Sequence, residues 1–298
     1  MHDAVVVGSG AAGGWAAKEL CDAGLDVLLL EAGRAIDPGA DFPLPAPPER
    51  RVASRVGAAL RGQPVQMRCA AFDARTRRFF VNDRDDPYTT PPGDAFNWFR
   101  GRQVGGRLHV WGRVALRLSE EELADWPLAA ADLAPFYDEV EGFIGVRDAE
   151  PTPAERRFAD AVADDVRVEP TRLAAHDPAR VPATIRAAEA SGRLTLRPDA
   201  VVRRVTLDPG RGRAGGVELA DRATGQAVRV QARLVVLCAG TIDTLRILLA
   251  SGIGASSGRL GRYLTDHVMT GIGGRLAGHG AAEPARSADP YDFGTATG

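Results

Sequence analysis

A glycine-rich turn between a short apolar run and a helical segment constrains this fold more than any other feature. Residues 3–7 predict a buried strand, and Gly8, Gly10 and Gly13 follow it in a GxGxxG pattern. The first glycine permits a tight turn, the second lets a phosphate approach the backbone, and the third lets helix and strand pack closely. The N-terminus of the next helix directs partial positive charge at the same phosphates. The pattern therefore predicts a βαβ unit that binds a dinucleotide.

An acidic residue completes this unit. Residues 11–23 predict the helix, Gly24 its C-terminal cap, and residues 26–30 a second apolar strand. Glu31 follows about twenty residues after the turn, where a carboxylate accepts hydrogen bonds from a ribose hydroxyl. Strand, helix and acid in register favour a dinucleotide site over a structural glycine turn. They leave open whether the dinucleotide is NAD or FAD.

Strand-like patterns return in the second half of the chain. Three runs separated by turn-rich residues predict a meander: 201–207, 216–220 and 227–232. Residues 234–237 predict a further buried strand that ends at Ala239-Gly240, and residues 241–250 predict a helix after it. This order predicts an α/β fold in which a β-meander is inserted before a late strand of the dinucleotide-binding sheet.

The middle of the chain differs in character. Proline-rich stretches make residues 40–94 mostly irregular, with a short helix near 52–60. Ser119 with Glu122, and Thr152 with Glu155, form candidate capping boxes that predict two helix starts. Between them, apolar residues recur at helical spacing and predict a helix whose stripe packs in the core: Leu133, Phe136, Tyr137, Val140 and Ile144.

Composition argues against several classes of function. The formal net charge is -2 over 298 residues, so no strong field attracts nucleic acid or an anionic membrane. The apolar runs are too short to span a bilayer, and without a basic leader before the first strand we expect no signal peptide. The three cysteines, an odd number without a CxxC pair, argue against a disulfide framework and a zinc site. We therefore expect a cytoplasmic protein without a metal site.

Several motifs in a fixed order carry a resemblance to one family. Residues 3–14 and 30–34 resemble the N-terminal signature of the glucose–methanol–choline (GMC) oxidoreductases. The loop 101–106, followed by Trp111-Gly112, resembles the second flavin loop of that family. The match continues at 238–240, 248–254, 260–262 and 266–267, so the resemblance covers most of residues 1–270.

The resemblance implies FAD as cofactor and the oxidation of alcohols, sugars or polyols by hydride transfer to the flavin, with an unspecified electron acceptor. The glycine turn would meet the pyrophosphate, Glu31 the adenosine ribose, and Val202 the adenine through its backbone. The implied cofactor-binding residues are Gly8, Gly10, Ala12, Gly13, Glu31, Ala32, Val104, Gly105, Gly106, His109, Val202, Ala239 and Gly240. Some relatives attach FAD covalently through a histidine in the second loop. For His109 we favour a polar residue that lines the cleft.

The family's catalytic histidine lies in a C-terminal region without a counterpart in these residues, so no catalytic residue is assigned. His267 is placed in a structural motif of the family. We expect a Rossmann-like FAD-binding domain with the inserted meander, a partial cap and substrate domain, and the start of an incomplete substrate domain. The FAD-binding domain is expected at residues 1–40, 95–118 and 192–270. The partial cap and substrate domain is expected at 41–94 and 119–191, and the start of the incomplete substrate domain at 271–298.

Three functional hypotheses follow. The chain is the FAD-binding part of an alcohol or sugar dehydrogenase or oxidase, or it is a flavin-binding protein or subunit that needs a partner chain. The third, an NAD-dependent dehydrogenase, is disfavoured by the meander and the late motifs.

Overall fold

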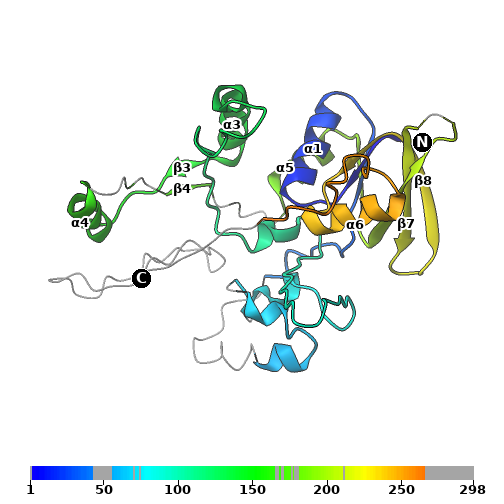
Figure 1. The fold of residues 1–298 in the computed structure, drawn as a ribbon, viewed down its shortest axis with the longest axis horizontal. Helices are drawn as coiled ribbons and strands as arrows, with labels where there is room; N and C mark the ends of the chain where they lie inside the picture. The colour runs from blue at the N-terminus through cyan, green and yellow to red at the C-terminus, as the bar shows by residue number, and fades with distance from the viewer. Residues whose placement is uncertain are drawn as a thin grey trace. The chain divides into compact units, whose positions relative to one another are not determined.

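The computed structural model describes residues 2–42, 56–69, 71–73, 75–164, 168, 171–175, 177, 181–210 and 212–265. The chain divides into two compact units (Figure 1). The first consists of Met1–Val110 and Ala179–Asp266, and the second of Trp111–Pro178 and His267–Gly298. The predicted cofactor and substrate domains are defined by function, whereas these two units are defined by the contacts within each. The division into domains therefore stays a prediction.

A six-stranded sheet forms the centre of the first unit, with the strand order β5-β2-β1-β8-β7-β6. The strands β5, β2, β1 and β8 are parallel, and the last three form an antiparallel meander. Their bounds are β1 His2–Val7, β2 Val27–Leu30, β5 Leu194–Arg197, β6 Ala200–Leu207, β7 Ala214–Asp221 and β8 Ala227–Leu237. The prediction of an α/β, Rossmann-like fold with a meander is confirmed.

The last strand corrects one detail of the prediction. Residues 227–232 and 234–237 are not two strands but one, β8. Its first part, from Ala227 to Gln231, pairs antiparallel with β7, and from Ala232 onward it pairs parallel with β1. Nothing between the two runs is a turn former, since only Arg233 separates them. The meander and the parallel strands are therefore one continuous sheet.

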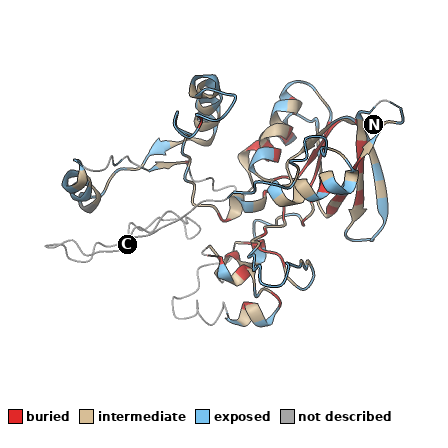
Figure 2. Ribbon diagram, viewed as in Figure 1, coloured by how far each residue is buried: buried red, intermediate tan, exposed pale blue. Residues whose placement is uncertain are grey.

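Helices and meander strands cover the parallel strands, which explains their uninterrupted apolar sequences. Ala4, Val6 and Leu29 pack with α1 (Ala11–Asp22) and α5 (Ala183–Ala190) on one face. The alternate residues Val5, Val7, Leu28 and Leu30 pack with the meander and with α6 (Thr241–Ser251) on the other. Figure 2 shows this buried centre in red. The helix α5 was not predicted, because Pro182 and its short alanine-rich sequence carry no capping signal.

A smaller aromatic core belongs to the irregular part of the first unit. It contains the buried side chains of Phe72, Phe79, Phe80 and Val110. Three short 3₁₀ turns build this region and its neighbour: η1 (Gln66–Arg68), η2 (Thr76–Phe79) and η3 (Gly106–His109). Of the predicted helix at 52–60, residues 56–60 are helical, and the preceding ones lie outside the described residues.

In the second unit, the two candidate capping boxes have different outcomes. Thr152 and Glu155 exchange both hydrogen bonds and start α4 (Pro153–Val162) as predicted. Ser119 and Glu122 also exchange theirs, but residues 120–125 form turns rather than a helix. Pro127 explains the difference, because it disfavours helical backbone at the residue before it. The remaining elements are α3 (Ala130–Ile144), β3 (Arg147–Asp148) and β4 (Arg172–Leu173).

The apolar stripe of α3 is the second correction. The helix forms as predicted, but none of its residues is buried, and Phe136 is 65% exposed. The stripe is therefore not a core face in the part of the chain that the structure describes. The helix is instead held by Glu141, which accepts hydrogen bonds from Arg117 and Arg172 at 2.5–2.9 Å. These two guanidinium groups lower the pKa of Glu141 to about 2.

Within the described ranges, we find no helix with the length and apolar character that crossing a membrane requires.

Candidate cofactor site

The glycine turn lies at the carboxyl end of β1, and packing fixes two of its glycines. Gly8 has φ +96°, and a Cβ there would lie 2.4 Å from the carbonyl oxygen of Cys238. A Cβ on Gly13 would lie 1.7 Å from the carbonyl oxygen of Gly8. Around Gly10, in contrast, a Cβ would meet nothing within 4 Å. The turn is thus tight on the protein side and open where a ligand would approach the backbone.

Two helices begin at this edge of the sheet without a side-chain cap. Gly10 precedes α1, whose first turn contains Ala12, and Gly240 precedes α6. The amide of Cys238 donates a 2.7 Å hydrogen bond to the carbonyl of Val7, which holds the ends of β8 and β1 side by side. Because β2 lies on the other side of β1, this is the point of a parallel sheet where dinucleotides bind. Ala239 and Gly240 follow β8 at this edge, and Gly240 directly precedes α6.

Glu31 directly follows β2, and the residue is only 6% exposed. Its Oε2 accepts hydrogen bonds from the Ser9 amide at 3.0 Å and from the Ser9 hydroxyl at 2.5 Å, and its Oε1 accepts one from the Gly33 amide at 2.8 Å. Burial raises the pKa of Glu31 above its ordinary value, and these hydrogen bonds oppose that shift. Ala32, next in the chain, is half-buried. A ribose hydroxyl would share the carboxylate oxygens with Ser9 and Gly33.

The second glycine loop packs directly on the first. The Val104 amide donates to the carbonyl of Arg34 at 3.0 Å, and the Gly105 amide donates to the Ser9 hydroxyl at 3.0 Å. A Cβ on Gly106 would lie 3.4 Å from the Cα of Gly10. The structure thus brings together the predicted residues Val104, Gly105 and Gly106 with the turn at Gly8–Gly13, although they are far apart in sequence.

Gly33 also packs against the second glycine loop, at the residues that precede Val104. A Cβ at Gly33 would lie 2.0 Å from the carbonyl carbon and oxygen of Arg102. At the next two residues, Arg34 and Gln103 form an isolated parallel bridge. The backbone of residues 33–34, after Glu31, is therefore in direct contact with the backbone of residues 102–103, before Val104.

His109 connects the second loop to the aromatic core of the first unit. Its Nε2 donates a 2.7 Å hydrogen bond to the carbonyl of Val104. Its ring stacks on Phe79, with centroids 5.1 Å apart, and meets the edge of Phe42 at 5.9 Å. Burial lowers the pKa of His109 below its ordinary value, so the ring is neutral near pH 7. These contacts suit a residue that positions the loop.

Val202 lies on β6 rather than on the glycine loops. It is buried, and its carbonyl accepts a hydrogen bond from Arg246 at 3.3 Å. The start of β6 is nevertheless held at the acidic end of the site, because the Ala200 amide donates to the carbonyl of Glu31 at 2.8 Å. His267, the other histidine weighed from the sequence, lies outside the described residues.

Two residues around the site were not predicted. Ser9 links Glu31 to the second loop, and its place inside the GxGxxG pattern was the available signal. Asp86 accepts a short hydrogen bond from Arg102 and two at 3.3 Å from Arg222. No sequence pattern pointed to Asp86, since its partners come from separate segments.

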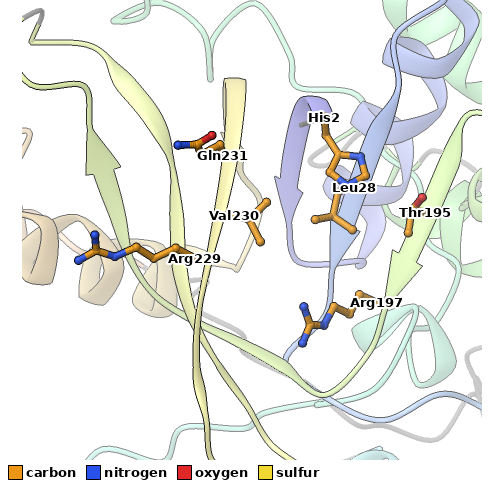
Figure 3. Close-up of a pocket in the computed structure, with 7 residues that line it drawn as sticks. All are labelled: His2, Leu28, Thr195, Arg197, Arg229, Val230 and Gln231. Carbon is orange, nitrogen blue, oxygen red and sulfur yellow. The ribbon is translucent and has the colours of Figure 1, made fainter.

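A pocket of about 540 Å³ lies elsewhere on the first unit (Figure 3). Residues of β1, β2 and β5 face residues of β8 across it. It is lined by His2, Leu28, Thr195, Arg197, Arg229, Val230 and Gln231. None of these belongs to the glycine loops or to Glu31, so this pocket is separate from the candidate cofactor site.

Known proteins resemble this chain over most of its length. Residues 180–269 match the family model of the GMC oxidoreductases. Paromamine 6'-oxidase from Streptomyces fradiae is 26% identical over 95% of this chain and 57% of its own length. C-glycoside 3-oxidase from Arthrobacter globiformis is 28% identical over 93% of this chain and 57% of its own length. The chain thus spans little more than half the length of these relatives.

A solved structure agrees in fold. Pyridoxine 4-oxidase from Mesorbium loti superposes with a TM-score of 0.56 at 23% identity, over 84% of this chain and 52% of that one. At this identity the likeness speaks for the fold alone. The family model and the two oxidases together lead to one conclusion: this chain is similar to the GMC oxidoreductases, with residues 180–269 matching the family model.

Proposed function

We propose that this chain is the FAD-binding part of an oxidoreductase that oxidises CH–OH groups of alcohols, sugars or polyols. The observation that carries the proposal is the contact between the two glycine loops at the carboxyl ends of β1 and β8, made by Ser9 with Gly105 and by Gly10 with Gly106. The relatives support the substrate class, because they are named as oxidases of paromamine and of C-glycosides.

The pyrophosphate of FAD fits the open side of Gly10. A side chain there would meet no protein atom, so the backbone can be approached closely. The uncapped N-terminus of α1 adds partial positive charge at this point, and the amides of its first turn are free to donate. Glu31 would bind the adenosine ribose while Ser9 and Gly33 hold its carboxylate in place.

The second loop would form the wall on the flavin side. Gly105 and Gly106 have φ of +88° and +53°, which favour glycine, and without side chains their backbone could be approached closely by the cofactor. His109 fixes this backbone through the carbonyl of Val104. When bound, FAD would supply the hydride acceptor, and these residues of the chain would hold the cofactor in position.

Removal of the substrate proton is not assigned to a described residue. The described histidines are His2 and His109, and the second is neutral and uses Nε2 to hold Val104. We therefore propose that substrate oxidation needs groups beyond those described. We retain the division into an FAD-binding domain (1–40, 95–118, 192–270) and substrate-side segments (41–94, 119–191, 271–298) as part of this proposal.

A second candidate is a flavin-binding protein or subunit that needs a partner chain. It is favoured by the described residues, since we assign removal of the substrate proton to neither His2 nor His109. In this case the chain binds FAD as above, but an added alcohol or sugar does not reduce the flavin.

Titration of the purified 298-residue chain with FAD tests the proposal. We expect saturable binding with the visible flavin absorption bands, and no comparable binding of NAD. Anaerobic addition of alcohols and sugars then separates the two candidates, because bleaching of the flavin band reports hydride transfer. A chain that retains no FAD at saturating concentration would overturn both.

A further inference from the structure

We propose that Ser9 is a positioning residue that couples the adenosine end of the cofactor site to the loop on its flavin side. This inference rests on the proposed function. Ser9 occupies a variable position of the GxGxxG pattern, and its side chain contacts both Glu31 and Gly105, the second of which lies 96 residues further along the chain.

The hydroxyl group of Ser9 acts both as a hydrogen-bond donor and as an acceptor. The Oγ donates its single proton to Glu31 Oε2 at 2.5 Å and accepts the Gly105 amide proton at 3.0 Å. The residue is fully buried, so water does not replace either partner. Because donation to Glu31 fixes the direction of the proton, it also fixes the lone pairs that Gly105 meets.

The bond to Gly105 is distinctive among the attachments of this loop. The Val104–Arg34 bond and the packing of Gly33 on Arg102 join backbone to backbone and need no particular side chain. Among the described hydrogen bonds, Ser9 supplies the side-chain link between the loop 103–106 and the glycine turn. That link lies next in the chain to Gly106, where an added Cβ would lie 3.4 Å from the Cα of Gly10.

The geometry gives the coupling a direction that can be tested. A ribose hydroxyl on Glu31 would hold the carboxylate that orients Ser9, and Ser9 would in turn hold Gly105 at the flavin side. In the proposed placement, a ligand with only the adenosine and diphosphate parts would end at the glycine turn, whereas FAD would continue to Gly105. Loss of the hydroxyl should therefore weaken binding of FAD more than binding of ADP.

The experiment compares FAD and ADP affinities of the wild-type chain with those of Ser9→Ala. We expect S9A to bind FAD about tenfold or more weaker, because a buried amide loses its acceptor, and to lose less affinity for ADP. The absorption and fluorescence of bound flavin should shift in S9A, since the loop beside it moves. Ser9→Cys keeps nearly the same volume with a weak donor, and it should show the same selective loss if S9A does not fold.

Ser251→Ala is the matched control. Ser251 also donates to one group, the Ile247 carbonyl, and accepts a backbone amide, that of Val205 at 2.8 Å. It lies at the C-terminal end of α6, away from the glycine loops, so S251A should leave the ratio of FAD to ADP affinity unchanged.

Three results decide the matter. Equal losses for FAD and ADP with an unchanged flavin spectrum would overturn the coupling and leave Ser9 as a support for Glu31 alone. A shift of the affinity ratio in S251A as large as that in S9A would overturn it as well. A wild-type chain that takes up no FAD would instead count against the proposed function.

Discussion

Alanine at Gly13 and alanine at Gly10 should separate the two tasks of the glycine turn, folding and ligand approach. At Gly13 the new Cβ would lie 1.7 Å from the Gly8 carbonyl oxygen. Real Cβ atoms stay at 3.0 Å or more from such an atom, so helix α1 and the turn must separate by about 1.3 Å. At Gly10 the same atom would enter open space.

The magnitudes follow from these distances. Overpacking against backbone costs about 1–3 kcal/mol, and in a chain of this size 1 kcal/mol lowers Tm by about 2–4 °C. Gly13→Ala should therefore melt several degrees below wild type. Gly10 has φ -68°, which alanine adopts freely, so Gly10→Ala should melt close to wild type.

Gly10→Ala should reduce the affinity for FAD although it leaves the thermal stability close to that of wild type. In G10A the added methyl occupies the space proposed for the pyrophosphate, so FAD binding should weaken at least about tenfold, equivalent to about 1.4 kcal/mol. Thermal melting without ligand and FAD titration measure the two effects separately. If G13A melts like wild type, the packing argument is wrong. If G10A binds FAD like wild type, the phosphate does not approach at Gly10.

Further predictions concern charge and the second loop. Asp86→Asn should destabilise the chain by about 1–3 kcal/mol in urea unfolding, because Arg102 and Arg222 lose their shared carboxylate, while the exposed neighbour variant Asp85→Asn should have little effect. The pKa of Glu141 is lowered to about 2 from 4.5, so its contribution to the free energy of unfolding is present above about pH 4.5 and is lost as the pH falls toward 2. The difference in stability between wild type and Glu141→Gln should therefore vanish between about pH 4.5 and pH 2. A difference that stays constant over this range would refute the ion pairs assigned to Glu141. Acid precipitation of the FAD-loaded chain should leave a colourless pellet, because Nε2 of His109 is held by Val104; a yellow pellet would show covalent attachment.

The local elements of the fold were predictable because each rests on neighbours in sequence. The glycine turn, the strands on either side and the capping box at Thr152 are patterns within a few residues. The capping box at Ser119 forms its hydrogen bonds but starts no helix, since Pro127 intervenes. A cap satisfies the first amides of a helix, but it does not supply the residues that continue one.

Errors arose where the outcome depends on distant parts of the chain. The stripe on α3 has the period of a buried helix face, yet periodicity does not say whether a partner surface lies opposite, and Phe136 is exposed. The sequence predicts two strands where β8 lies, because its first half has the pattern of a meander strand and its second half that of a parallel strand. Both readings were right locally, and the unbroken backbone between them makes a single sheet.

The candidate site shows why motif residues and contact residues differ. A sequence motif records the positions where only one residue type fits, such as Gly8 and Gly13, whose Cβ atoms would overlap backbone. Ser9 stands between them at a position where the turn tolerates many residues, so the motif does not mark it. Its role comes from Gly105, which is brought to it only by the folded chain. Positions left variable by a motif are therefore where a protein can adjust how its phosphate loop is joined to the rest of the cofactor site.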